Sequence, residues 1–140
     1  MEKRIDPEDM YKSIWEFPDN LNEAFELGSA IKLKNSYTDI HNIVVAGMGG
    51  SAIGGDVLAS LESAKLKIPL IVCRGYTLPN WVSNKTLVIC SSYSGNTEET
   101  LYALEKCQSR GAEIAVITSG GKLKALAEEN KYNTIIIPGN

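Results

Sequence analysis

The chain has 140 residues, a length that fits one domain with a core of its own. Its 14 Lys and Arg residues against 17 Asp and Glu give a formal net charge of −3, which excludes the strongly basic surface typical of nucleic-acid-binding proteins. No apolar run reaches the about 20 residues of a membrane span, and no secretory signal is recognisable. The three cysteines, Cys73, Cys90 and Cys107, lack metal-binding spacing, so we expect reduced thiols in the cytoplasm.

The first two predicted elements are helices. The run Asp6-Pro7-Glu8-Asp9 indicates the start of a helix, because it combines a capping side chain, a proline and first-turn acids. This helix is predicted to end near Phe17-Pro18. A second helix is predicted from about Pro18 to Lys34. Its apolar stripe consists of Leu21, Ala24, Phe25, Gly28 and Ile31. We expect residues 1–36 to form a helical segment that packs on a domain formed by residues 37–140.

After residue 41, short apolar runs alternate with helical patterns. The predicted strands are 42–46, 69–73, 86–90, 113–118 and 133–137, and the predicted helices are about 51–63, 97–110 and 121–129. This alternation predicts an α/β fold, a three-layer αβα sandwich around a five-stranded parallel sheet covered on both faces. Residues 76–81 are too few for a crossover helix, so an irregular bridge or a single helical turn is expected there.

Two segments rich in glycine and hydroxyls each follow a predicted strand and open a predicted helix. The first loop is Gly47-Met48-Gly49-Gly50-Ser51, and the second loop is Ser91-Ser92-Tyr93-Ser94-Gly95-Asn96-Thr97. Glycines let the backbone approach a ligand, and a helix N-terminus with nearby hydroxyls favours an anion such as phosphate. With strand order 2-1-3-4-5, both loops border the point where the strand order reverses, where ligands bind. The sequence therefore predicts a phosphorylated ligand between the two loops.

Several single residues allow a structural and a functional interpretation. Ser51 either caps a helix or meets the phosphate. Asn96 and Glu99 fit a capping pair, which leaves three hydroxyls for the ligand: Ser92, Ser94 and Thr97. Gly95 is expected to adopt a backbone conformation that other residues disfavour.

Residues near the two loops are also open to two interpretations. The third loop, Thr118-Ser119-Gly120-Gly121, either touches a sugar or is a simple turn. Arg74 either reaches an anionic group or forms a surface ion pair, and Glu98 and Glu99 either act as a base or stabilise a helix start. His41 precedes the first strand, so it lies opposite the loops and is a poor catalytic candidate.

The first loop together with Ser92-Tyr93-Ser94-Gly95-Asn96-Thr97-Glu98-Glu99-Thr100 resembles the sugar isomerase (SIS) domain. The chain is most similar to the bifunctional phosphoglucose/phosphomannose isomerases, through Gly-Gly-Ser-Ala-Ile-Gly-Gly-Asp at 49–56. Arg74-Gly75-Tyr76 and Ile117-Thr118-Ser119-Gly120-Gly121 also resemble that family. The resemblance covers about residues 42–139 and implies a flavodoxin-like fold.

This resemblance also implies a function. Family members interconvert glucose 6-phosphate or mannose 6-phosphate with fructose 6-phosphate, without cofactor or metal, as homodimers that are longer than this chain. By resemblance, the substrate phosphate is held by Gly49, Gly50, Ser51, Ser92, Ser94 and Thr97, with Gly47, Tyr93, Gly95 and Asn96 as supporting loop residues. The catalytic base and the ring-opening acid lie in a second, C-terminal SIS half. We therefore expect this chain to be the N-terminal, phosphate-binding half and to be inactive alone.

Two other functions fit part of the pattern. SIS domains also occur in regulators, so a non-catalytic sugar-phosphate-sensing module is an alternative, although no basic DNA-binding face is apparent. The pattern Gly47-x-Gly49-x-x-Ala52 fits a loose dinucleotide-binding fingerprint. Arg74 stands where that fingerprint expects an acid, and a dehydrogenase would leave the second loop unexplained.

Overall fold

The computed structural model describes residues 5–139, which divide into two compact units after Lys32. The first unit contains α1 (Met10–Trp15) and α2 (Phe17–Ala30), separated by Glu16 alone. The Asp6 carboxylate accepts the backbone N–H groups of Tyr11 and Met10 at 2.9 and 2.8 Å, which lowers its pKa. Asp6 thus pairs with the first amides of α1, but the predicted helix start is wrong: α1 begins at Met10 with Asp9 as its N-cap, so the proline and the acids precede the helix.

The predicted end of the second helix is wrong. Instead of continuing to Lys34, α2 ends at Ala30. In the second unit, the Lys34 N–H donates to the side-chain carbonyl of Asn133 at 2.6 Å, so this backbone group pairs with a distant side chain and not within a helix. Among residues 5–139, no helix is long and apolar enough to cross a membrane.

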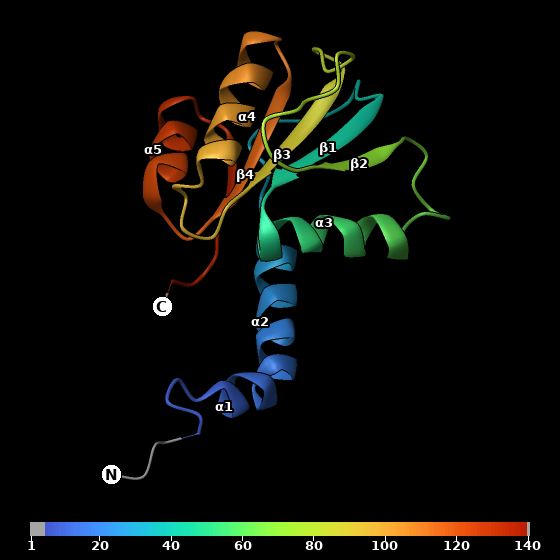
Figure 1. Cartoon of the computed structure of the whole chain (residues 1–140). Coiled ribbons are helices and arrows are strands. Elements are labelled where there is room, and N and C mark those ends of the chain that lie inside the picture. Colours follow the sequence, from blue (N-terminus) through green and yellow to red (C-terminus); the bar gives the residue numbers. More distant parts are fainter. Residues whose placement is uncertain (1–4, 140) are drawn as a thin grey trace. The chain divides into compact units, whose positions relative to one another are not determined.

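The second unit is built on a five-stranded parallel sheet (Figure 1). The strands are β1 (Asn42–Gly47), β2 (Leu70–Cys73), β3 (Thr86–Ser91), β4 (Glu113–Thr118) and β5 (Asn133–Ile136). Their order, β2-β1-β3-β4-β5, confirms the prediction. Gly47 pairs with Ser91 across β1 and β3, so the first and second loops leave the sheet next to each other.

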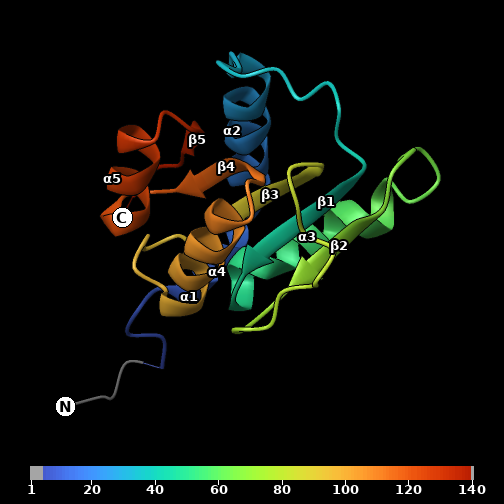
Figure 2. The ribbon, with the colours of Figure 1, turned by 90° about the horizontal axis from the view of Figure 1, so that it is seen from above.

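Helices lie on both faces of this sheet (Figure 2). The helix α3 (Gly49–Leu61) covers β1 and β2, while α4 (Glu98–Ser109) and α5 (Gly121–Glu129) cover β3, β4 and β5 on the other side. The core lies mainly on the α4 and α5 side, where alternate strand residues meet the helices: Val44, Val88, Val116, Leu104 and Leu123 are at most 1% exposed. Because α3 lies over β1 and β2, burial in β3 alternates between buried and half-buried side chains.

Two local features bring the helices and loops close to the sheet. A Cβ at Gly55 would lie 2.9 Å from Val45 Cγ1, so only glycine allows α3 to pack this tightly on β1.

The segment from residue 74 to 85 crosses from β2 to β3 as irregular chain, which confirms the predicted bridge. It is held by the buried side chain of Val82 and by the Arg110 guanidinium, which donates to the Pro79 carbonyl at 2.7 Å.

Candidate functional site

The first and second loops meet at the carboxyl end of the sheet. The backbone N–H of Tyr93 donates to Ser51 Oγ at 3.3 Å, which links the loops directly. A Cβ at Gly47 would lie 2.8 Å from the Ser91 carbonyl oxygen, so glycine is required where β1 passes β3. The predicted neighbourhood of the two loops is therefore present.

A hollow of about 560 Å³ lies beside this junction. Gly50 and Ser51 line it from the first loop, and Ser91 and Tyr93 line it from the second. Gly49 has a φ of +51°, a conformation that favours glycine, and an added Cβ at Gly49 or Gly50 would meet no atom within 4 Å. The backbone at these two glycines is thus open to an approaching group.

The helix α4 begins at the second loop without a side-chain cap. Its N-cap residue is Thr97, and no side-chain hydrogen bond caps the helix start. The predicted Asn96–Glu99 capping pair is therefore wrong. Asn96 Oδ1 instead accepts the N–H of Lys122 at 3.1 Å, at the start of α5. The first amide groups of α4 consequently keep the partial positive charge that attracts anions.

The hydroxyls of the second loop are connected to one another. Ser92 is 1% exposed, and its Oγ accepts the Gly95 N–H at 3.1 Å and lies 2.8 Å from Thr97 Oγ1. Ser94 is exposed, and its Oγ accepts the Asn96 N–H at 3.2 Å. If Ser92 donates its proton to Thr97, the Thr97 hydroxyl is left with a proton to donate outward. Ser92 therefore lies beneath the loop, whereas Ser94 and Thr97 are nearer its surface.

The charged residues near the two loops have partners within the protein. Arg74 pairs with Asp56 of α3, and both side chains are nearly half exposed, so the structure has the surface ion pair. Burial, a hydrogen bond to Glu98 and the charges of Glu98 and Glu99 raise the pKa of Tyr76. Tyr76 also packs edge-on against Tyr102 of α4, with ring centroids 5.3 Å apart. Sequence reasoning missed this tyrosine beside the start of α4, and its only signal was the Arg-Gly-Tyr resemblance.

Other titratable groups lie away from the two loops. His41 precedes β1 and its ring contacts Asp39 at 3.2 Å, at the opposite end of the sheet as predicted. Burial raises the pKa of the Cys107 thiol to about 11 and raises that of Cys90 further. Within residues 5–139, no cluster of His, Cys, Asp and Glu is arranged to hold a metal ion.

The third loop packs behind the second loop. Ser119 Oγ donates to the Tyr93 carbonyl at 2.6 Å, and the Leu123 N–H donates to the Gly95 carbonyl at 2.9 Å. The third loop is thus more than a simple turn, because it braces the segment that carries the candidate phosphate ligands.

A parallel sheet with helices on both faces and a reversal of strand order between β1 and β3 defines a doubly wound α/β domain. The chain belongs to the SIS domain family, whose model matches residues 36–140. The resemblance stated from the sequence is therefore confirmed.

Individual relatives agree with this membership. The bifunctional phosphoglucose/phosphomannose isomerase of Caldicellulosiruptor bescii is 48% identical over 129 residues, which are 92% of this chain and 38% of the relative. The D-glucosamine-6-phosphate 4-epimerase of Sulfolobus acidocaldarius is 44% identical over 97 residues, 69% of this chain and 30% of the relative. The chain thus spans well under half the length of these two relatives.

The solved structures agree on the fold. The C-terminal domain of glucosamine-fructose-6-phosphate aminotransferase from Francisella tularensis superposes with a TM-score of 0.72. The superposition covers 96% of this chain and 41% of that chain, at 18% sequence identity. A likeness at this level of identity concerns the fold alone.

Proposed function

We propose that this chain supplies the sugar-phosphate-binding half of a phosphoglucose/phosphomannose isomerase. The observation that carries the proposal is the start of α4, where uncapped amide groups lie beside the hydroxyls of Ser94 and Thr97. The relative of Caldicellulosiruptor bescii, named for this activity, supports the choice of substrate. The reaction would interconvert glucose 6-phosphate or mannose 6-phosphate with fructose 6-phosphate.

The phosphate would be held by groups of both loops. Its oxygens would accept hydrogen bonds from the first amides of α4 and from the hydroxyls of Ser94 and Thr97. Ser92 would act from below, by orienting the hydroxyl of Thr97. Ser51 Oγ already accepts the Tyr93 N–H, so its own proton can turn to the phosphate. The open backbone at Gly49 and Gly50 would let the ligand come close.

Isomerisation needs further groups. A base must move a proton between C1 and C2 through an enediolate, and an acid must open the sugar ring. Within residues 5–139, the one histidine lies at the other end of the sheet. We propose that the acid–base groups belong to a second half of a longer, homodimeric protein. The phosphate site would then convert remote binding energy into orientation of the sugar.

The test is a titration of the chain with fructose 6-phosphate and with unphosphorylated fructose, followed by calorimetry. Binding should depend on the phosphate, and the double variant Ser94→Ala, Thr97→Ala should bind at least about tenfold more weakly because two donors to a charged group are lost. Ser63→Ala is the matched control, since Ser63 Oγ donates to the Ser60 carbonyl at the end of α3. Equal binding of fructose, or no binding by a folded sample at millimolar ligand, would reject the proposal.

An isomerisation assay tests the division of labour between the two halves. The chain alone should show little or no turnover of fructose 6-phosphate. Turnover comparable to that of the bifunctional isomerase of Caldicellulosiruptor bescii would contradict the proposal that the acid–base groups lie outside this chain. Tight binding without turnover by a longer protein that contains this chain would favour a sugar-phosphate sensor.

A further inference from the structure

Four consecutive backbone carbonyl groups of the second loop, from Ser92 to Gly95, are paired within the protein. The Ser92 carbonyl accepts the Gly95 N–H at 3.2 Å, and the Tyr93 carbonyl accepts both the N–H and the hydroxyl of Ser119, at 3.1 and 2.6 Å. The Ser94 carbonyl accepts Asn96 Nδ2 at 3.2 Å. The Gly95 carbonyl accepts the Leu123 N–H at 2.9 Å. Because a carbonyl oxygen repels an anion, the direction of these groups decides whether the loop accepts phosphate.

The third loop and the start of α5 supply several of these donors. The two segments approach so closely that a Cβ at Gly95 would lie 1.8 Å from the Gly120 carbonyl oxygen. A Cβ at Gly121 would lie 2.4 Å from the Ser94 carbonyl oxygen. Both glycines also have φ near +70°, at +67° and +69°. The second and third loops therefore interlock in one register.

The backbone amide groups at the start of α5 are engaged in this contact. The N–H of Lys122 donates to Asn96 Oδ1, and the N–H of Leu123 donates to the Gly95 carbonyl. These amides of α5 consequently face the second loop and not a ligand. The asymmetry between α4 and α5 is clear: α4 starts without a side-chain cap, while α5 starts against the loop that precedes α4.

We propose that Ser119 and Asn96 are positioning residues of the phosphate site. They turn the carbonyls of Tyr93 and Ser94 away from the ligand, so that amide groups and hydroxyls face it. The inference rests on the proposed function, because it assumes that the second loop binds the phosphate. Without the Ser119 hydroxyl, the Tyr93 carbonyl loses its shortest bond and keeps the longer ones from the Ser119 N–H at 3.1 Å and the Thr118 hydroxyl at 3.5 Å. The peptide between Tyr93 and Ser94 is then held less firmly, and part of the preorganisation of the site is lost.

The first experiment compares Ser119→Ala with the unmodified chain by titration with fructose 6-phosphate. We expect the affinity to fall about three- to tenfold, the effect of one lost hydrogen bond, and Ser119→Thr to restore it because threonine keeps the hydroxyl. Ser109→Ala is the matched control, since the Ser109 hydroxyl donates to a helix carbonyl at the far end of α4. That control should bind as the unmodified chain does.

A second variant separates positioning from stability. Asn96→Ala removes bonds to Lys122 and Ser94, at the end of α5 near the site. Asn130→Ala removes bonds to Gln108 and Leu126, at the other end of α5. Both variants should lower the unfolding temperature, but only Asn96→Ala should lower the affinity for fructose 6-phosphate. Amide NMR shifts of Gly95 and Thr97 on ligand addition should shrink in that variant alone.

The outcomes distinguish this inference from the proposed function. If the unmodified chain fails to bind fructose 6-phosphate, both are wrong. If it binds, but Ser119→Ala and Asn96→Ala bind equally well, the positioning role is wrong and the proposed function stands. Affinity losses no larger than those of the Ser109→Ala and Asn130→Ala controls would likewise reduce Ser119 and Asn96 to structural residues.

Discussion

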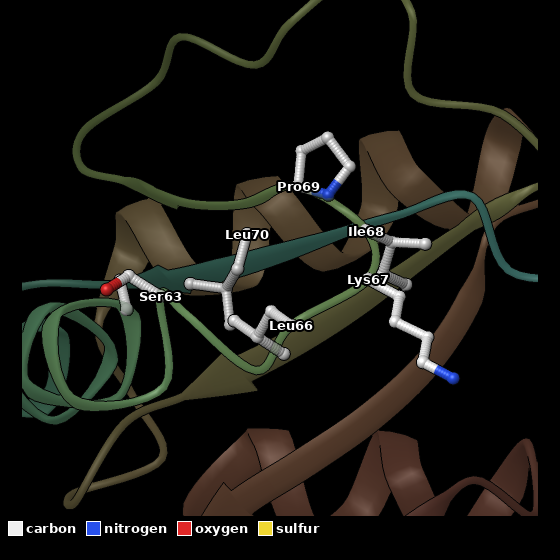
Figure 3. Close-up of a pocket in the computed structure, with 7 residues that line it drawn as sticks. Ser63, Leu66, Lys67, Ile68, Pro69 and Leu70 are labelled. Carbon is white, nitrogen blue, oxygen red and sulfur yellow. The ribbon is translucent and has the colours of Figure 1, made fainter.

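Each end of the sheet has a hollow, and neither the size nor the polarity of its lining marks the carboxyl end as the site of an anion. At the amino end of β2, a cavity of about 420 Å³ is lined by polar and apolar groups in about equal parts, and its lining residues include Leu66, Ile68, Pro69 and Leu70 (Figure 3). At the carboxyl end, the hollow of about 560 Å³ has a mostly apolar lining, which includes Ile117 and Ile137, and residues of the two loops border it. Volume therefore does not tell the two ends apart.

The difference lies in which polar groups remain for a ligand. At the amino end, the Ser63 hydroxyl donates to the Ser60 carbonyl, and Figure 3 shows the amino group of Lys67 directed away from the leucines. At the carboxyl end, the start of α4 keeps amide groups without a side-chain cap, next to Ser94 and Thr97. The comparison teaches that a site is recognised by donors aimed at one point, more than by empty space.

The largest expected effect on stability compares one glycine at each end of the sheet. Gly95, at the carboxyl end, and Gly111, before β4 at the amino end, have φ of +67° and +72°. Replacement by alanine costs about 1 kcal/mol of backbone strain at either position. Gly95→Ala should cost more than about 3 kcal/mol in total, because its Cβ would lie 1.8 Å from the Gly120 carbonyl oxygen.

At Gly111 the nearest atom to the added Cβ would be 3.9 Å away, so Gly111→Ala should cost the strain alone. Urea unfolding measures both free energies. Equal costs for the two variants would show that the second and third loops do not interlock as described.

A smaller effect tests how dry the sheet is beneath the second loop. Cys90 of β3 is fully buried, and burial together with the nearby Cys107 raises the pKa of its thiol above the ordinary 9.0. Above pH 9 the unfolded chain loses this proton while the folded chain keeps it. The Cys90 thiol should therefore contribute a fall of about 1.4 kcal/mol in the free energy of unfolding per pH unit above pH 9.

The variant Cys90→Ala removes this titration, so its stability should fall less steeply above pH 9. Urea unfolding from pH 8 to pH 10.5 gives the two slopes. The half-buried thiol of Cys73 provides the control, and Cys73→Ala should change the slope less. An unchanged slope in Cys90→Ala would mean that the thiol ionises in the folded chain, and that water reaches the floor of the site.

The smallest expected effect concerns exposed ion pairs at the two ends. Arg74 pairs with Asp56 near the first loop, and Lys85 pairs with Asp39 at the amino end. Arg74→Ala and Lys85→Ala should each lower the free energy of unfolding by less than about 1 kcal/mol. Only Arg74→Ala should weaken fructose 6-phosphate binding, by about twofold at low salt, through the lost positive field. A tenfold loss would make Arg74 a direct ligand of the phosphate.

Much of the fold follows from local patterns. The strand from 113 to 118 and the helix from 121 to 129 have the predicted bounds, because apolar runs and helix-start residues are read within a few positions. The crevice between the first and third strands follows from the same patterns, once the strand order is assumed. These predictions depend on neighbours in the sequence.

The details of the site depend on distant residues, and there the predictions were incomplete. Asn96 fits a capping pair with Glu99, yet its carboxamide binds Lys122, 26 positions further on. The second helix ends early, and the Lys34 N–H instead meets Asn133, 99 positions away. Side-chain partners of this kind follow from the folded arrangement, which a single sequence does not reveal.

The close approach of Gly95 and Gly121 has a consequence for anyone who would transplant this site. The second loop cannot be grafted alone onto another strand–helix junction, because its conformation depends on contacts with the third loop and the start of α5. A transferable cassette would need both crossovers, from β3 through the first turn of α5. The smallest segment that could carry the second loop in its observed conformation thus includes both the second and the third loop.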